Sequence, residues 1–240
     1  MTTKYKTRAF VFKKNDKSEA DRNFSVFTED YGRLEILGRA IRKINSKLRA
    51  GIDMFYFSEI EFIEGKNNKT LTDATKIKIF DNISKNFKKI EIAYRIADTL
   101  DNFLKGQEKD HMLFGLLNEL FEKLDSQQLT INNQQLIYYY FIWNFLSLQG
   151  YGSEVYNCAS CQEKLNPYSI YFSNKEGGVI CKKCLDKDKN AQKINSDIVK
   201  TLRIIIKKDW DTLLRLKIEQ SSQQLLGKIS ESALTAFCPT

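Results

Sequence analysis

Two Cys-x-x-Cys pairs constrain the fold of this chain more than any other feature of its 240 residues. The pairs are Cys158 with Cys161 and Cys181 with Cys184, so four of the five cysteines lie within 27 residues. This spacing is typical of a zinc site, in which four thiolates surround one ion at about 2.3 Å. Redox disulfides are the alternative, but dithiol redox motifs usually occur singly on a βαβ unit, which the sequence lacks. We therefore expect a ribbon at residues 155–190 that binds one Zn²⁺ per chain.

Such a zinc would be structural, because four sulfurs leave no coordination position open for water or substrate. Its binding free energy, on the order of 10 kcal/mol, would stabilise a ribbon that is too small to have a core of its own. Elsewhere no catalytic motif is evident. His111 has no nucleophile nearby and is expected at the surface or as a helix cap, and Cys238 is expected to be an idle thiol. The sequence thus predicts a protein that is not an enzyme.

The first 80 residues read as antiparallel β structure. Apolar and polar residues alternate in five stretches, separated by turn-forming residues, with no long helical pattern between the first three. Five strands in about 75 residues suit a small closed barrel of the oligonucleotide-binding (OB) type. The expected strands are Thr7–Lys13, Asn23–Thr28, Arg33–Gly38, Met54–Glu64 and Thr70–Phe80.

From residue 81 to residue 240 the pattern is helical, apart from the ribbon. A first helix is expected to begin at Ser84, with an inward face of Phe87, Ile90, Tyr94, Ala97, Leu100 and Leu104. A second is expected over Asp110–Leu124, and a third, apolar almost all round, over residues 132–148. Three amphipathic stretches follow the ribbon, at Ser196–Lys207, Asp209–Lys217 and Ser221–Ala233. The predicted fold class is therefore α+β: an OB barrel at 1–80, then a single helical bundle at 81–240 with an inserted four-cysteine ribbon.

Charge is distributed unevenly along the chain, whose net charge is +8. Residues 1–80 hold 17 Lys and Arg against 11 Asp and Glu, and residues 158–240 hold 14 against 9, whereas residues 101–157 hold 3 against 7. Two basic regions around an acidic one favour an anionic partner. No apolar run approaches the roughly 20 residues of a membrane span, and no secretory signal is visible. With cysteines spaced for metal, we expect a cytoplasmic protein without a membrane partner.

The richest basic cluster is the segment 39–49, which holds five cations and no acid. Phosphates attract such a patch independently of base sequence, although a solvated loop is the alternative. The cluster comprises Arg39, Arg42, Lys43, Lys47 and Arg49, and the other candidate nucleic-acid-binding cations of the barrel are Arg8, Lys13, Lys14, Arg22, Arg33, Lys66 and Lys69. Nine barrel aromatics are expected mainly in the core, with some available for base stacking: Phe10, Phe12, Phe24, Phe27, Tyr31, Phe55, Tyr56, Phe57 and Phe62.

Taken together, several segments resemble the RecO family of bacterial recombination-mediator proteins. The resemblance lies in their order and spacing: residues 19–22 with 27–34, the basic segment 38–48, residues 69–74, Gly150-Tyr151 before the first cysteine pair, and Gly177-Gly178 before the second. Asn157 and Gln162 depart from the family pattern, and the chain after Ala191 matches only loosely.

This resemblance implies DNA repair by homologous recombination, through binding of single- and double-stranded DNA and annealing of complementary strands. It also implies that the protein acts at the nucleoid, works with RecR to load RecA, and binds the C-terminal tail of single-stranded DNA-binding protein through its helical domain. The tail pocket cannot be assigned to residues. The resemblance also implies that the residues of the family's basic loop correspond here to Arg39, Arg42, Lys43 and Lys47. The main alternative is a zinc-ribbon adaptor for proteins that does not bind nucleic acid, and a less supported one is an RNA-directed enzyme.

Overall fold

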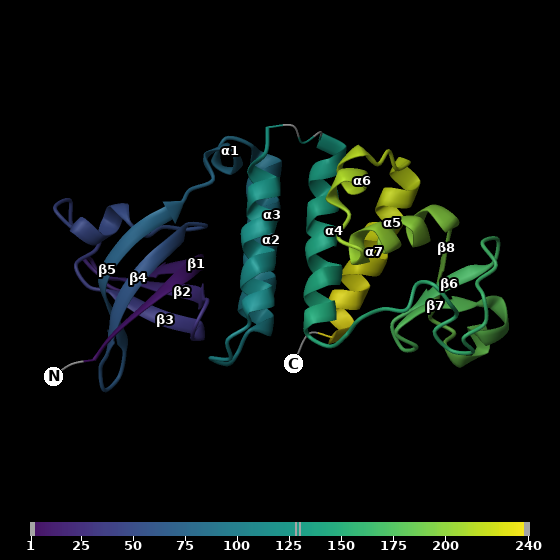
Figure 1. Ribbon diagram of the computed structural model, residues 1–240, viewed down its shortest axis with the longest axis horizontal. Coiled ribbons are helices and arrows are strands. Elements are labelled where there is room, and N and C mark those ends of the chain that lie inside the picture. Colours follow the sequence, from purple (N-terminus) through teal and green to yellow (C-terminus); the bar gives the residue numbers. More distant parts are fainter. Residues whose placement is uncertain (1–2, 128, 130, 238–240) are drawn as a thin grey trace. The chain divides into compact units, whose positions relative to one another are not determined.

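The computed structural model describes residues 3–127, 129 and 131–237 and divides into two compact units, Met1–Gln127 and Gln128–Thr240 (Figure 1). Cys238 lies outside the described residues. In the first unit, the strands close into a barrel in the order β1-β2-β3-β5-β4, with β4 paired back onto β1 and β3 parallel to β5. This is the predicted OB-type arrangement. The strands are β1 (Lys4–Asp16), β2 (Arg22–Thr28), β3 (Gly32–Gly38), β4 (Phe57–Glu64) and β5 (Lys69–Lys78).

Alternation along the strands fills the barrel as expected. Every second residue of a strand points inward, and the core takes Phe24 and Val26 from β2, Leu34 and Ile36 from β3, and further residues from the other strands. Six of the nine aromatics considered for base stacking are buried: Phe10, Phe12, Phe24, Phe27, Phe57 and Phe62. These six serve packing rather than an exposed stacking surface.

Strand β4 begins at Phe57, three residues later than expected. Phe55 has a φ of 64°, in the left-handed region, and the N–H of Tyr56 donates to the carbonyl of Asp53 over 3.1 Å. A turn of this kind cannot continue a strand. Between β3 and β4, the end of the basic segment forms a short 3₁₀ helix, η1 (Lys47–Ala50).

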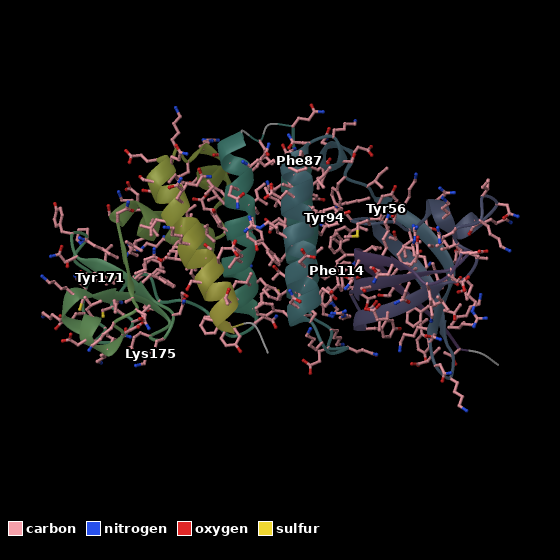
Figure 2. The ribbon with its side chains drawn as sticks, turned by 180° about the vertical axis from the view of Figure 1, so that it is seen from behind. Tyr56, Phe87, Tyr94, Phe114, Tyr171 and Lys175 are labelled. Carbon is pink, nitrogen blue, oxygen red and sulfur yellow. The ribbon has the colours of Figure 1, made fainter. Side chains whose placement is uncertain are left out.

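Three helices complete the first unit: α1 (Asp81–Ser84), α2 (Phe87–Phe103) and α3 (His111–Asp125). Asn86, not Ser84, caps α2 by accepting from the N–H of Lys89. The expected inward face of α2 is partly wrong, because Phe87 is 84% exposed and Tyr94 48% exposed (both labelled in Figure 2). The residues that α2 buries include Ile92, Ala93, Ile96, Ala97 and Leu100.

Helix α3 agrees with its prediction and packs on the barrel. Asp110 caps it, and its leucine and phenylalanine face is buried. That face comprises Leu113, Leu116, Leu117, Leu120, Phe121 and Leu124. The ring of Phe121 lies 4.6 Å from that of Phe10, and Phe114 (Figure 2) lies 5.5 Å from Phe57, between ring centroids. Because α2 and α3 pack with the barrel, the first compact unit continues to Gln127. Residue 80 is therefore close to the end of the barrel but not to the end of the unit, and the single bundle expected over 81–240 is divided between the two units.

The second unit is built around α4 (Ile131–Leu148), with α5 (Ser196–Ile206), α6 (Trp210–Arg215) and α7 (Gln220–Phe237). As predicted, α4 is buried on nearly all sides. Tyr140 stacks on Trp210 at 3.9 Å, and the indole N–H of Trp143 donates to the hydroxyl of Ser230 over 2.9 Å. No helix among the described residues has the length and hydrophobicity needed to cross a membrane.

The ribbon lies in sequence between α4 and α5. Its sheet has the order β7-β6-β8, from β6 (Ile170–Ser173), β7 (Gly178–Cys181) and β8 (Gln192–Ile194), and η2 (Lys182–Lys187) follows β7. The predicted turn at residues 175–178 joins β6 to β7, where Gly177 has a φ of 72°. The ribbon packs on the helices through the rings of Phe172 and Trp143, 5.3 Å apart, and through Arg203, which donates to the carbonyl of Val155 over 2.9 Å.

Candidate nucleic-acid interface and metal centre

The four predicted cysteines meet in one cluster. Their sulfurs all lie within 4.8 Å of one another, and the Sγ atoms of Cys161 and Cys181 are 3.8 Å apart. A tetrahedron with metal–sulfur bonds of about 2.3 Å has edges of about 3.8 Å. The residues therefore fit a four-coordinate metal, and the all-sulfur donor set could bind zinc.

Each cysteine pair sits on a tight local structure. In the first, the N–H of Gln162 donates to the carbonyl of Cys158 over 2.8 Å, and Gln162 has a φ of 63°. Gln162 therefore holds a conformation that glycine adopts more easily than a residue with a side chain. The second pair follows β7 into η2, and the N–H of Cys181 points at the sulfur of Cys158, 3.4 Å away. Backbone donors thus support the sulfurs that face the metal position.

Burial and backbone donors act in opposite directions on the Cys158 thiol. Burial raises its pKa, but the N–H groups of Cys161, Cys181 and Ser160 stabilise the thiolate, and the net effect lowers the pKa to about 6. For Cys184, burial and the neighbouring thiols raise the pKa to about 12. One thiolate therefore forms readily, and placing four together requires a cation among them.

A groove of about 650 Å³ runs along the barrel of the first unit. It is bordered by the ends of the β1–β2 and β4–β5 hairpins and by the loop after α2, and its floor includes Asn23, Arg33 and Glu35 from β2 and β3. In OB folds, the β2–β3 face and the β1–β2 and β4–β5 loops are the parts that bind oligonucleotides. The groove lies in that position.

The groove is polar and basic. Five cations line it against three acids, and five of the other residues are Asn or Gln. Two of the acids are engaged by cations in the groove, since Glu35 accepts from Arg33 and Glu64 from Lys69. No aromatic side chain is among the described residues that line it. The cationic and amide side chains of the lining can all donate hydrogen bonds. They are Lys17, Lys66, Lys69, Lys105, Arg33, Asn15, Asn23, Asn67, Asn68 and Gln107.

The basic segment 39–49 packs against the β1–β2 loop, which also borders the groove. The N–H of Arg42 donates to the carbonyl of Ala20, and its guanidinium donates to the carbonyl of Ser18 over 2.8 Å. Arg42 also lies 3.4 Å from the carboxylate of Asp16, a groove residue. The β1–β2 loop therefore connects the groove to the exposed cations Arg39, Lys43, Lys47 and Arg49.

Comparison with known proteins now identifies the family. A family model described as recombination protein O N terminal matches residues 1–80, and one described as recombination protein O C terminal matches residues 84–236. The chain belongs to the RecO family. Over 216 residues it is 32% identical to the DNA repair protein RecO of Dehalococcoides mccartyi (strain ATCC BAA-2266 / KCTC 15142 / 195), covering 90% of this chain and 83% of that protein. Over 224 residues it is 30% identical to the DNA repair protein RecO of Caldanaerobacter subterraneus subsp. tengcongensis, covering 93% and 89%.

Within this RecO family DNA repair protein, the predicted cations fall into two groups. Among the residues that the structure describes, Lys66, Arg39, Lys43, Lys47 and Arg49 make no ion pair, and they stay candidates for DNA contact. Arg42 is also exposed but lies 3.4 Å from the carboxylate of Asp16. The others are engaged inside the first unit: Arg8 with Glu29, Lys14 with Asp53, Arg22 with Asp16, Lys69 with Glu64, and both Lys13 and Arg33 with Asp101.

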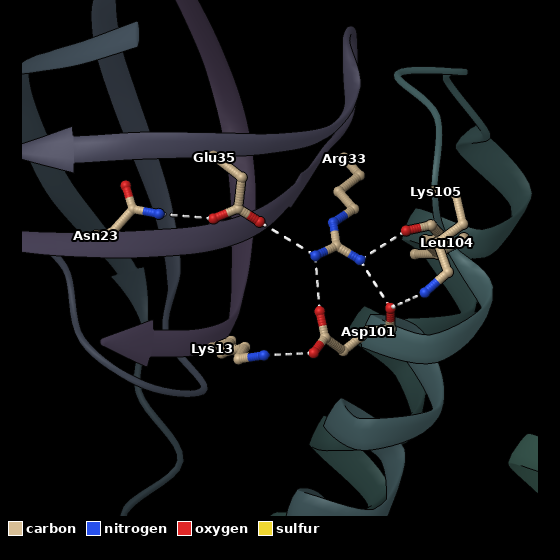
Figure 3. A network of polar contacts seen from close by, with 7 residues as sticks. All are labelled: Lys13, Asn23, Arg33, Glu35, Asp101, Leu104 and Lys105. Atoms are coloured by element: carbon tan, nitrogen blue, oxygen red, sulfur yellow. Dashed lines mark hydrogen bonds and ion pairs between the residues drawn. The ribbon is translucent and has the colours of Figure 1, made fainter. Parts of the chain in front are cut away.

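Lys13 and Arg33 form the most extensive of these contacts (Figure 3). Arg33 donates to the carbonyls of Asp101 and Leu104, over 2.8 and 2.6 Å, and to the Asp101 carboxylate over 2.6 Å. Lys13 donates to the other carboxylate oxygen over 2.5 Å. Burial raises the pKa of Asp101, but the hydrogen bonds from Lys13 and Arg33 outweigh it and lower the pKa below its ordinary value. This geometry fits a structural tie between the barrel and α2.

The RecO groove also contains residues that the sequence interpretation missed. Lys17 and Lys105 line the groove but are not among the predicted binding cations. Lys17 lies between β1 and β2, and Lys105 follows α2, far from the barrel in sequence. Asn67 and Asn68, between β4 and β5, also line the groove and were not predicted. The available signal was positional: in an OB fold, any Lys or Asn in the two hairpin loops is a candidate for the binding face.

Proposed function

We propose that this RecO-family protein binds single- and double-stranded DNA through the groove and the 39–49 segment and anneals complementary strands. The observation that supports this most directly is the coincidence of a basic, amide-lined groove with the face that OB folds use for oligonucleotides. Exposed cations on the adjoining segment extend the surface along which a phosphate backbone can run.

The chemistry of the groove favours contacts with phosphates over contacts with bases. Ammonium groups and side-chain amides bind phosphate oxygens without reading sequence, whereas sequence-tolerant base binding usually depends on aromatic stacking. Among the described residues that line the groove there is no aromatic ring. A strand held by its backbone keeps its bases available for pairing, and neutralised phosphates repel a second strand less. Annealing follows from these two effects and needs no bond-breaking chemistry, so we propose a role without enzymatic activity.

The partners and cofactor of the proposal follow from the family. We propose that the protein works in the bacterial cytoplasm with RecR to load RecA, and that it binds the C-terminal tail of single-stranded DNA-binding protein. One Zn²⁺ per chain, held by the four cysteines, would preserve the shape of the ribbon. DNA repair by a RecO-family protein is what family membership supports here, and these finer steps are the proposal built on it.

A strand-annealing assay on DNA coated with single-stranded DNA-binding protein tests the proposal, combined with salt titration of DNA binding. The groove variant replaces Lys17, Lys66 and Lys105 with Gln. A control variant makes the same charge change at Lys76, Lys85 and Lys88, exposed lysines of the same unit that do not line the groove.

We expect the groove variant to anneal more slowly and to lose about 2 from the slope of log affinity against log salt, at about 0.7 per phosphate contact with a single strand. The control should lose much less. If the wild-type protein fails to bind DNA even at about 50 mM salt, where phosphate contacts are strongest, the proposal fails and a protein-interaction adaptor becomes the better interpretation.

A further inference from the structure

The segment 39–49 is held in a defined shape at both ends. Ile41 is only 3% exposed and belongs to the core cluster of the barrel, and Leu48 packs against the same cluster. Between them, the N–H of Ser46 donates to the carbonyl of Lys43 over 3.1 Å, which closes a β-turn. The turn is therefore presented by a fixed base.

The β1–β2 loop supports this base from the side. The N–H of Ala40 donates to the carboxylate of Asp21 over 2.8 Å, and the N–H of Arg42 donates to the carbonyl of Ala20 over 3.0 Å. The arginine side chain adds its bond to the carbonyl of Ser18. These contacts place the turn beside a loop that borders the groove.

Ile44 occupies the second position of this turn and is 95% exposed. A turn corner usually carries proline or a small polar residue, and nothing in the backbone geometry calls for a branched aliphatic side chain there. The residues on either side, Lys43 and Asn45, are exposed and polar, and so is Lys47. An apolar side chain is thus fixed in water at the centre of a cluster of cations.

We propose that Ile44 packs against a nucleobase of a single strand whose phosphates are bound by the surrounding cations. This inference rests on the proposed function. Cations bind the phosphates of a nucleotide, while aliphatic side chains such as Ile contact base faces or insert between base steps. A protein partner fits this feature less well, because stable protein interfaces bury about 1,000 Å² or more around an apolar centre, and here a lone aliphatic residue is surrounded by charge.

One aliphatic contact also suits the mechanism. The groove supplies no described aromatic ring, so the base contact would come from the turn rather than from the groove floor. A single weak contact would unstack one base and leave its neighbours free to pair. The residue would therefore contribute to the search for complementary sequence as well as to affinity.

The test compares binding of the full-length protein to an oligothymidylate and to an abasic strand of equal length, which keeps the phosphates and lacks the bases. The variants are Ile44→Ser, the conservative Ile44→Leu, and Ile77→Ser, which removes an exposed isoleucine (48% exposed) from β5 as a matched control.

We expect I44S to bind the oligothymidylate about 3- to 10-fold more weakly, equivalent to roughly 0.7–1.4 kcal/mol, with unchanged binding to the abasic strand and an unchanged salt slope. I44L and I77S should behave like the wild type. Equal losses on both strands, or no loss on either, would overturn the inference. If the wild-type protein itself binds neither strand, the proposed function fails instead, so the two failures are distinguishable.

Discussion

The guanidinium of Arg33 on β3 lies 2.6 Å from the carboxylate of Asp101 on α2, and the same group donates to two carbonyl oxygens at the end of that helix. The last carbonyls of a helix have no intrahelical donors, and they carry the negative end of its dipole. A sheet residue therefore caps α2 and ties it to the barrel. The cation predicted to bind phosphate instead directs most of its donors into the protein.

We expect Arg33→Gln to lower the free energy of unfolding by about 1.5–3 kcal/mol, because hydrogen bonds to charged groups contribute about this much. Arg8→Gln provides the matched control. Arg8 also pairs with a carboxylate, that of Glu29, but its side chain is 57% exposed and such pairs contribute about 0–1 kcal/mol. Urea unfolding of the full-length variants measures both values. Equal losses of unfolding free energy would show that the contacts of Arg33 with Asp101 stabilise the fold no more than an exposed ion pair does.

Acid should weaken the same tie. Burial raises the pKa of Asp101, but the hydrogen bonds from Lys13 and Arg33 lower it by more. The pKa of Asp101 is therefore lower in the folded state than in the unfolded state. The stability that Asp101 contributes is therefore fully present above an unfolded pKa of about 3.9, and it is lost as the pH falls through the folded pKa. We expect Asp101→Asn to be less stable than the wild type at pH 7 and to approach it below about pH 4. Unfolding free energies measured across this range test the point, and a difference that does not change with pH would contradict it.

Local sequence patterns predicted much of the fold, because strands and helices each have a characteristic spacing of apolar residues. The barrel and the buried face of α3 follow from alternation and from the leucine spacing. The face of α2 was harder. This helix carries apolar residues on two arcs, and packing against the barrel selects the arc with Ile92 and Ile96, leaving Phe87 in solvent. Only the tertiary partner decides between the arcs.

The candidate sites show the same contrast. The metal cluster was predictable because its ligands are close in sequence and their chemistry allows few alternatives. The groove was not, because its lining comes from two hairpin ends and from a loop after α2. The structural role of Arg33 was equally hidden, since Asp101 is 68 residues away in the chain. Composition marked the 39–49 segment as basic, but which cations remain available depended on such distant partners.

Removal of the metal should unfold the ribbon and leave the barrel intact. We expect Cys184→Ser to reduce the bound zinc well below one per chain and to lower the melting temperature of the second unit, because metal affinity on the order of 10 kcal/mol is part of the folding energy of such sites. Cys238→Ser is the thiol control and should keep one zinc per chain. Metal analysis and calorimetry measure these effects.

The barrel groove lies in the other compact unit, so DNA binding by the groove should survive loss of the zinc. Wild-type metal content in C184S would argue against four-cysteine coordination. A complete loss of DNA affinity in a variant whose barrel still melts cooperatively would show that the ribbon contributes to the binding surface.

The basic segment allows a last test of which cations meet phosphate. Arg39, Lys43 and Lys47 are exposed, whereas Arg42 is engaged by Asp16 and the carbonyl of Ser18. Reversal of the first three to Glu should weaken DNA binding and reduce the salt slope by about 2 on single strands and nearer 3 on duplex, at about 0.7 and 0.9 per contact. Leaving Arg42 in place keeps the loop attached to the barrel, so a change in slope can be assigned to lost phosphate contacts rather than to unfolding.

Net charge changes by the same amount in a control that reverses Lys76, Lys85 and Lys88, and this control separates contact from general repulsion. Long-range repulsion is screened over about 10 Å at 0.1 M salt. The control should therefore lose affinity mainly in dilute buffer and bind like the wild type near 0.1 M salt, whereas the segment variant should still bind more weakly there. Parallel titrations of both variants would mean that the segment attracts DNA only through its overall charge. In that case the contacts would have to be sought among the groove lysines alone.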